Sequence, residues 1–293
     1  MLRKIIDEAL SHNRYFFHKT DFFTGELGLS VSMVLFGMIN EETSIYERGM
    51  LKLQDIINKC KNNQECNDKD IWILVVLLKF LHENDFIEIE ENTLTSLIPN
   101  RYKCSANKMV RSKYFTCYAY IGFDYLDLHT IWQEMILELS DIILREDNIL
   151  FIYNCFFAAT CFVRSGNEEF GNILVLIKNM TENLSIEQFD FLSIDNLVML
   201  WKITQQDACL SVIKNRMEHM LYAGQSLSSL IRTTYQVSDL YDDDNIIEKV
   251  KLMVMTTGNW SLVNGKLSLL FLDKSIYKSS DLQSIGFVFN LFD

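Results

Sequence analysis

A single proline, Pro99, stands among 293 residues, together with only 11 glycines. Average usage would give ~15 prolines and ~20 glycines in a chain of this length. Immunoglobulin-like sandwiches and propellers need many more of these turn residues. The 49% of hydrophobic residues are enough to bury a core, which excludes general disorder. The sequence therefore predicts a compact all-α protein.

Richly apolar segments alternate with amphipathic ones along the chain. Residues 27–38 are almost all apolar, whereas residues 46–60 place apolar side chains among charged ones. Residues 149–163 are again apolar, and residues 170–180 follow with the i, i+3, i+4, i+7 spacing of one helical face. We expect helix pairs that stack into an α/α toroid or, as the alternative, an open α-solenoid. No linker-like composition divides the chain, so we expect one domain over residues 1–293.

Two residues mark expected helix ends. Ser193 comes directly before an apolar segment that contains Trp201, and serine is a preferred N-cap residue. Gly224 follows an amphipathic segment over residues 210–221, where a glycine typically ends a helix. These positions predict one helix that starts after Ser193 and a second that stops at Gly224.

Residues 84–114 depart from the alternation, and we expect an irregular insertion there. Residues 85–91 alternate apolar and acidic side chains. The bases that follow, without an intervening acid, are Arg101, Lys103, Lys108, Arg111 and Lys113. The two halves could neutralise each other. The alternative is a partner-binding site in which these bases, with Tyr102 and Tyr114, receive an acidic peptide or a phosphate.

Charge and cysteine usage narrow the classes of partner and compartment. The formal net charge of −12 argues against a general nucleic-acid binder, because phosphate backbones favour clustered Lys and Arg. The 7 cysteines form no C-x-x-C pair, as expected for buried thiols in a reducing compartment. The first residues mix charges and do not resemble a signal peptide, and the longest apolar runs fall short of the ~20 residues that span a bilayer. We therefore expect a cytoplasmic protein without a membrane span.

Two glycine-containing segments resemble the lanthionine synthetase C-like family. Gly25-Glu-Leu-Gly28 directly precedes a long apolar segment, and Gly265 precedes another. Both are similar to the openings of that family's repeats, where helix starts crowd near the axis of an α/α toroid. The segment from Cys117 to Gly122 is similar to the family motif that supplies a zinc ligand. The resemblance thus implies the toroid, with structural glycines at Gly25, Gly28 and Gly265.

The chain departs from the family at the zinc ligands. Where the family has a cysteine-histidine-glycine motif, the best corresponding residues are Val263, Asn264 and Gly265, and neither Val nor Asn can replace a thiolate and an imidazole on zinc. In the other motif the glycine after the tyrosine is replaced by Ala119, and the proline by Ile121. The resemblance therefore implies the fold without the metal site.

These observations favour a non-catalytic helical-repeat protein that binds a peptide or protein partner, such as a scaffold in peptide modification, with no catalytic residue, metal or cofactor. The chain also lacks phosphate-binding, dinucleotide-binding and nucleophile-elbow motifs. One alternative is a zinc-dependent lanthionine cyclase-like enzyme that acts on a modified peptide and uses Cys117. Another is an α-solenoid interaction protein unrelated to the cyclases.

Overall fold

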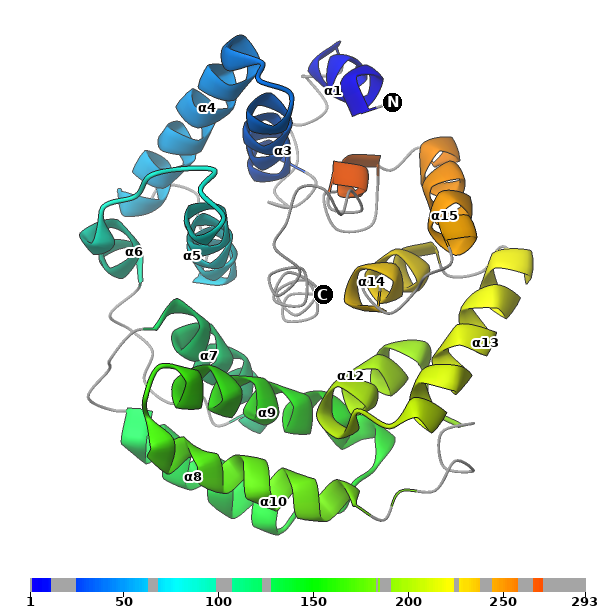
Figure 1. Ribbon diagram of the computed structural model, residues 1–293. Helices are drawn as coiled ribbons and strands as arrows, with labels where there is room; N and C mark the ends of the chain where they lie inside the picture. Colours follow the sequence, from blue (N-terminus) through cyan, green and yellow to red (C-terminus); the bar gives the residue numbers. More distant parts are fainter. Residues whose placement is uncertain are drawn as a thin grey trace. The chain divides into compact units, whose positions relative to one another are not determined.

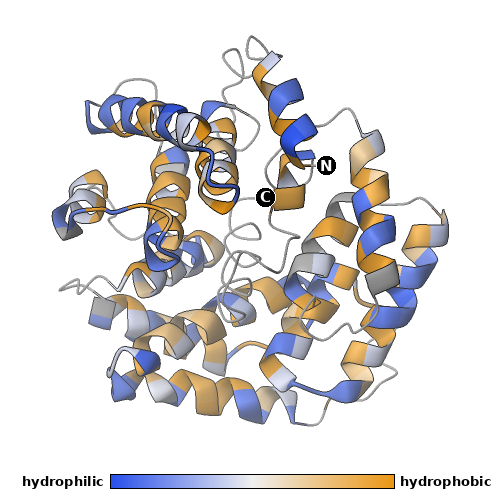
Figure 2. Ribbon diagram, turned by 45° about the horizontal axis from the view of Figure 1, so that its top comes forward, coloured by the Kyte–Doolittle hydropathy of each residue, from blue (hydrophilic) through white to orange (hydrophobic). Residues whose placement is uncertain are grey.

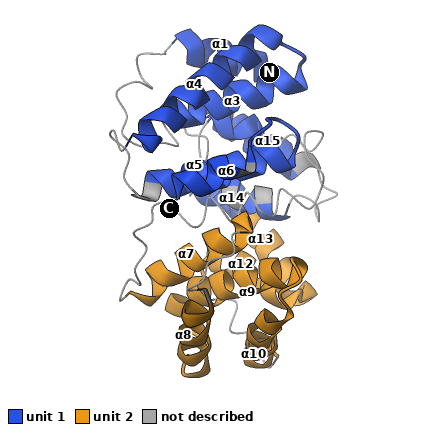
Figure 3. Cartoon of the chain, turned by 90° about the vertical axis from the view of Figure 1, so that its left-hand side faces the viewer, with its two compact units in different colours: residues 1–99, 219–293 blue, residues 100–218 orange. Residues whose placement is uncertain are grey.

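The computed structural model describes residues 2–11, 25–62, 68–98, 107–122, 128–182, 184, 191–223, 227–237, 244–257 and 266–270, and every regular element among them is a helix (Figure 1). This confirms the all-α prediction. Contacts divide the chain into two compact units, Met1–Pro99 with His219–Asp293 (unit 1) and Asn100–Glu218 (unit 2) (Figure 3). The single domain, the toroid and the solenoid all stay predictions. Among the described helices, none combines the length and the apolar character that crossing a membrane requires.

Unit 1 is built around a helix that is apolar on all sides. Its elements are α1 (Leu2–Ser11), α3 (Glu26–Ile39), α4 (Thr43–Lys61), α5 (Asp68–Glu83), α6 (Glu91–Leu97), α14 (Leu227–Val237), α15 (Asp244–Thr256) and the short 3-10 helix η4 (Lys266–Leu270). In α3 every residue from Leu27 to Gly37 is buried, which is the expected state of an all-round apolar helix too short to cross a membrane. It packs against α4, α1 and η4. Figure 2 colours the residues by hydropathy, and the amphipathic helices show blue hydrophilic residues on one side and orange hydrophobic residues on the other.

Glycines allow α3 and α4 to pack closely. A Cβ atom added at Gly37 would lie 2.5 Å from the backbone N of Tyr46, and one added at Gly49 would lie 2.9 Å from the backbone N of Val34. Both distances are shorter than any ordinary Cβ contact, so the two backbones approach where only hydrogen fits. The sequence resemblance pointed instead to Gly25 and Gly28, which are buried at the start of α3. Gly265 lies outside the described residues.

The prediction of an irregular insertion over residues 84–114 is wrong for most of the residues in this range that the structure describes. Residues 91–97 form α6, and the helix α7 (Lys108–Ile121) begins within the stretch. Residues 84–90 are irregular as expected, and they are fixed to unit 1 because Phe86 and Ile87 are buried. The Tyr46 hydroxyl donates to the Phe86 carbonyl at 3.1 Å. This segment is therefore a packed connection between helices.

Unit 2 surrounds one central helix, α9 (Ile149–Arg164), which contacts helices on several sides. The other elements are α7, α8 (Leu128–Ser140), η1 (Glu146–Asn148), η2 (Glu168–Phe170), α10 (Gly171–Thr181), α12 (Ile194–Thr204) and α13 (Asp207–Ala223), within which unit 2 ends at Glu218. Four aromatic rings from α7, α8, α9 and η2 meet in its core. Their centroids are 4.2 Å apart for Trp132 and Phe170, 4.3 Å for Phe162 and Phe170, and 5.3 Å for Phe115 and Phe162.

Several sequence predictions of helices in unit 2 are confirmed. The periodic segment over residues 170–180 forms the last residue of η2 and most of α10, with Phe170, Ile173 and Ile177 buried. Ser193 is the N-cap of α12, and its hydroxyl accepts from the backbone N–H of Asn196 at 3.3 Å. The helix α13 ends at Ala223, whereas its expected stop, Gly224, lies outside the described residues.

Candidate functional site

The expected basic site is only partly described, and its described bases do not share one face. Arg101, Tyr102 and Lys103 lie outside the described residues, whereas Lys108, Arg111 and Lys113 all belong to α7. At 100° per residue, Lys113 is roughly 160° around the helix from Arg111. These residues therefore cannot form a single continuous basic face on α7.

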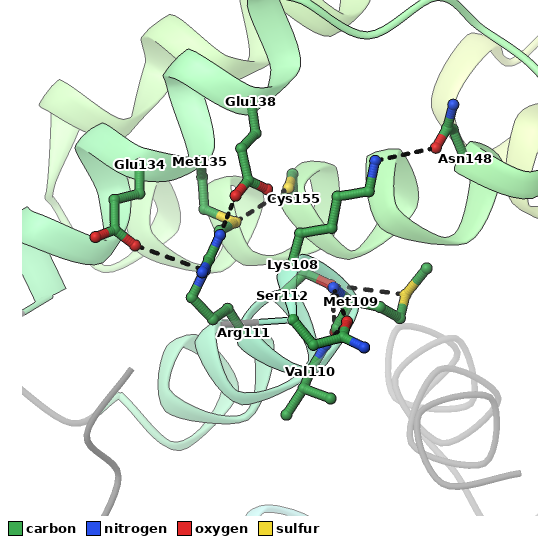
Figure 4. A network of polar contacts seen from close by, with 11 residues as sticks. Lys108, Met109, Val110, Arg111, Ser112, Glu134, Met135, Glu138, Asn148 and Cys155 are labelled. Atoms are coloured by element: carbon green, nitrogen blue, oxygen red, sulfur yellow. Dashed lines mark hydrogen bonds and ion pairs between the residues drawn. The ribbon is translucent and has the colours of Figure 1, made fainter. Parts of the chain in front are cut away.

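Arg111 is neutralised inside unit 2 by two acids of α8 (Figure 4). Glu134 and Glu138 are four residues apart, so both carboxylates lie on the same side of that helix. The Nε atom of Arg111 is 3.5 Å from Oε2 of Glu134, and its Nη2 atom pairs with Oε1 of Glu138. The Arg111 side chain is only 14% exposed. The charge of Arg111 therefore links α7 to α8 within unit 2 and is not available to a binding partner.

Lys108 lies at the start of α7, where the helix is capped by Asn107. The Asn107 side-chain oxygen accepts from the backbone N–H of Met109 at 2.9 Å. The Nζ atom of Lys108 donates to Oδ1 of Asn148 at 3.4 Å and lies 5.5 Å from the centroid of the Phe151 ring. An ammonium over an aromatic face is attracted by the ring quadrupole. Lys108 thus connects α7 with the start of α9 while the residue stays exposed.

A buried polar cluster fixes α7 against α9. The Asn154 amide Nδ2 donates to Oγ of Ser112 at 3.0 Å, and the Thr116 hydroxyl reaches the backbone oxygens of Ser112 at 2.7 Å and of Asn154 at 3.1 Å. All three side chains are fully buried. Buried polar groups are stable only when hydrogen-bonded, so these contacts specify how the two helices meet. We assign the cluster a structural role.

The residues around Cys117 do not fit a zinc site. Its thiol is fully buried, and burial raises its pKa far above the ordinary value, whereas a zinc ligand must be a thiolate. No group of three His, Cys, Asp or Glu side chains within the described residues is placed to hold a metal ion. The motif that ends at Gly122 forms the last turn of α7, and Gly122 is its C-cap with a φ of 74°.

Two neighbouring helices of unit 2, α8 and α10, expose faces with little charge. They contact each other and lie side by side in Figure 1. The exposed residues of α8 are His129, Thr130, Gln133, Leu137 and Ser140, and those of α10 are Asn172, Val175, Lys178 and Asn179. Leu137 is 67% exposed and Val175 is 61% exposed. We call these nine residues the α8–α10 surface.

Sequence reasoning missed the α8–α10 surface. The period of apolar residues in α10 showed which side is buried, but a single apolar residue on the outer side looks like ordinary surface. The sequence of α8 also does not show that Glu134 and Glu138 are paired with Arg111 of α7. That fact depends on the packing of α7 against α8.

Comparison with known proteins identifies no relative. No protein-family model, no curated protein and no solved structure matches the chain significantly.

Proposed function

We propose that this chain is a non-catalytic helical-repeat protein that binds a peptide or protein partner through the α8–α10 surface. The observation that carries the proposal is the face of α8, where Leu137 is 67% exposed and Glu134, whose side chain is 40% exposed, is paired with Arg111 of α7. Charged residues are depleted in the cores of protein interfaces because burying them requires desolvation.

The side chains of the α8–α10 surface suit an amphipathic partner. Full burial of a Leu or Val side chain stabilises a complex by about 1.5–3 kcal/mol, so covering the two-thirds of Leu137 and Val175 that are exposed contributes roughly 1–2 kcal/mol each. The amides of Gln133, Asn172 and Asn179 can both donate and accept hydrogen bonds. We therefore propose a partner segment with an apolar stripe bordered by uncharged polar groups.

The order of the helices supports the repeat part of the proposal. The deeply buried helices α3, α9 and α12 are each followed by a helix with an exposed side, namely α4, α10 and α13. We propose that these are pairs of an α/α toroid, with an open solenoid as the alternative. Small-angle scattering of the full chain distinguishes them, since a compact profile supports the toroid and a strongly elongated one overturns it.

Selection from a random peptide library tests the binding proposal. The full chain is immobilised, and the affinity of an enriched, fluorescein-labelled peptide is then measured by anisotropy. We expect the double variant Leu137→Asp, Val175→Asp to bind at least tenfold more weakly than the wild type, because it places two charges in the interface. The matched control is Leu51→Asp, Leu252→Asp, at positions that are 68% and 66% exposed in unit 1. Failure to enrich any peptide, or equal weakening by both double variants, would overturn the proposal.

A further inference from the structure

The outer side of α4 in unit 1 carries an exposed leucine in the middle of a polar stripe. The helix packs on α3 with a buried side that includes Leu53 and Ile56 (Figure 1). Leu51 is 68% exposed, and at 100° per residue it lies roughly 160° around the helix from Leu53. A lone exposed leucine is ordinary on a protein surface, so the residues around it decide what this side can bind.

Arg48 and Asp55 lie on one edge of this stripe, before and after Leu51 along the helix. Both are exposed, and they lie roughly 60° and 40° around the helix from Leu51 in the same direction. Arg48 precedes Leu51 by about 4.5 Å along the helix axis, and Asp55 follows it by about 6 Å. The two do not pair with each other or with any other residue that the structure describes. This edge therefore presents one cation and one anion at nearly equal distances from the leucine.

Glu47 and Gln54 occupy the opposite edge in the same way. Both are exposed, and they lie roughly 40° and 60° from Leu51 in the other direction, about 6 Å before it and about 4.5 Å after it. The Nε2 atom of Gln54 donates to Oδ1 of Asn58 at 3.2 Å and keeps a second hydrogen for another acceptor. This edge therefore presents a carboxylate and an amide donor at nearly equal distances from the leucine.

The stripe is complementary to itself when two copies of α4 lie antiparallel with Leu51 against Leu51. A two-fold axis through this contact puts Arg48 of each copy opposite Asp55 of the other, and Glu47 of each copy opposite Gln54 of the other. Two ion pairs and two amide–carboxylate hydrogen bonds then border the apolar centre. A parallel arrangement would put Arg48 on Arg48 and Asp55 on Asp55, so the charges select the antiparallel one.

We propose that this chain forms a symmetric dimer in which α4 packs antiparallel against α4 of a second copy. Both copies use the same patch, as in any two-fold interface. One helix pair is a small contact, and the net charge of −12 on each copy opposes association. We therefore expect a weak, reversible dimer with a Kd of roughly 100 µM. Well below this concentration the chain is monomeric, so Leu51 remains a valid control position for peptide binding in unit 2.

Sedimentation equilibrium of the full chain tests the dimer first. The wild type should associate as its concentration rises to about 500 µM, fivefold above the expected Kd. Arg48→Asp and Asp55→Arg should each weaken association at least tenfold, because each puts like charges opposite one another at two symmetric positions. Both residues are exposed, so the thermal midpoint should change by no more than about 2 °C. A wild type that stays monomeric over this range overturns the proposal.

A mixture of the two variants gives the sharper test. Arg48→Asp carries a carboxylate at both positions and Asp55→Arg carries a guanidinium at both, so each repels its own copy while the two together restore both ion pairs. We expect the mixture, with one variant fluorescein-labelled, to associate within threefold of the wild type.

The matched control variants are Arg164→Asp and Glu169→Arg, which reverse exposed charges of unit 2 and change the net charge by the same amounts. Each should associate within threefold of the wild type. A mixture of Arg48→Asp and Asp55→Arg that associates no better than either variant alone overturns the proposal, and so does equal weakening by the control variants. None of these four changes touches the α8–α10 surface, so failure of the dimer and failure of the proposed function are distinguishable.

Discussion

Replacing Gly37 by alanine should force α3 and α4 apart. The new Cβ would lie 2.5 Å from the backbone N and 2.8 Å from the Cα of Tyr46, and backbone atoms cannot move aside as a flexible side chain can. Relief of the clash needs a shift of about 1 Å, in a helix whose residues are buried from Leu27 to Gly37. Overpacking of this kind costs about 3 kcal/mol, and the better helix propensity of alanine returns about 1 kcal/mol. The expected net loss in the free energy of unfolding is about 2 kcal/mol.

Urea denaturation followed by far-UV circular dichroism measures this loss. At 2–4 °C per kcal/mol for chains of similar size, the thermal midpoint should fall by roughly 4–8 °C. The control is Gly171→Ala at the start of α10, where an added Cβ meets nothing within 4 Å; this change should be neutral or stabilise by up to about 1 kcal/mol. If Gly37→Ala is as stable as Gly171→Ala, the close approach of α3 and α4 is not a property of the folded chain.

Two further predictions concern unit 2. Arg111→Met leaves Glu134 and Glu138 facing each other without a cation, and we expect urea denaturation to show a loss of about 2 kcal/mol in the free energy of unfolding; this is less than the ~3–5 kcal/mol for breaking a fully buried pair, because the carboxylates are partly exposed. Adding Glu134→Gln and Glu138→Gln should restore part of the lost stability. A further loss of stability on adding them would contradict the pairing. Because burial raises the pKa of the Cys117 thiol, it should resist iodoacetamide at pH 8 in the folded chain and react in urea, and purified chain should carry no stoichiometric zinc. One equivalent of zinc that Cys117→Ala removes would favour the enzyme alternative.

Much of the helical fold could be predicted from the sequence, and the exceptions have physical causes. The helices α3, α9 and α10 are unmistakable because an all-round apolar segment, or a strict apolar period, leaves no other stable arrangement. The helix α7 was not predicted because its basic residues made the segment look like exposed surface. The acids that pair with Arg111 lie on α8, more than twenty residues later in the sequence. Close approach at Gly37 and Gly49 is a property of two packed helices, so no motif within one helix indicates it. The prediction of Gly25 and Gly28 as structural glycines stays a prediction.

The candidate sites were less predictable than the fold. A run of basic residues suggests a binding site only as long as the acidic side chains that pair with them are unknown. In the structure, Glu134 and Glu138 pair with Arg111.

Photo-crosslinking tests the central claim, peptide binding by the α8–α10 surface, most directly. The residue p-benzoylphenylalanine is placed at position 137 of the full chain, or at position 51 as a control of equal exposure, and each chain is irradiated with a peptide from the library selection. The account predicts a crosslinked product from position 137 that excess unlabelled peptide abolishes, and none from position 51. Equal crosslinking at both positions, or none at position 137, would contradict it.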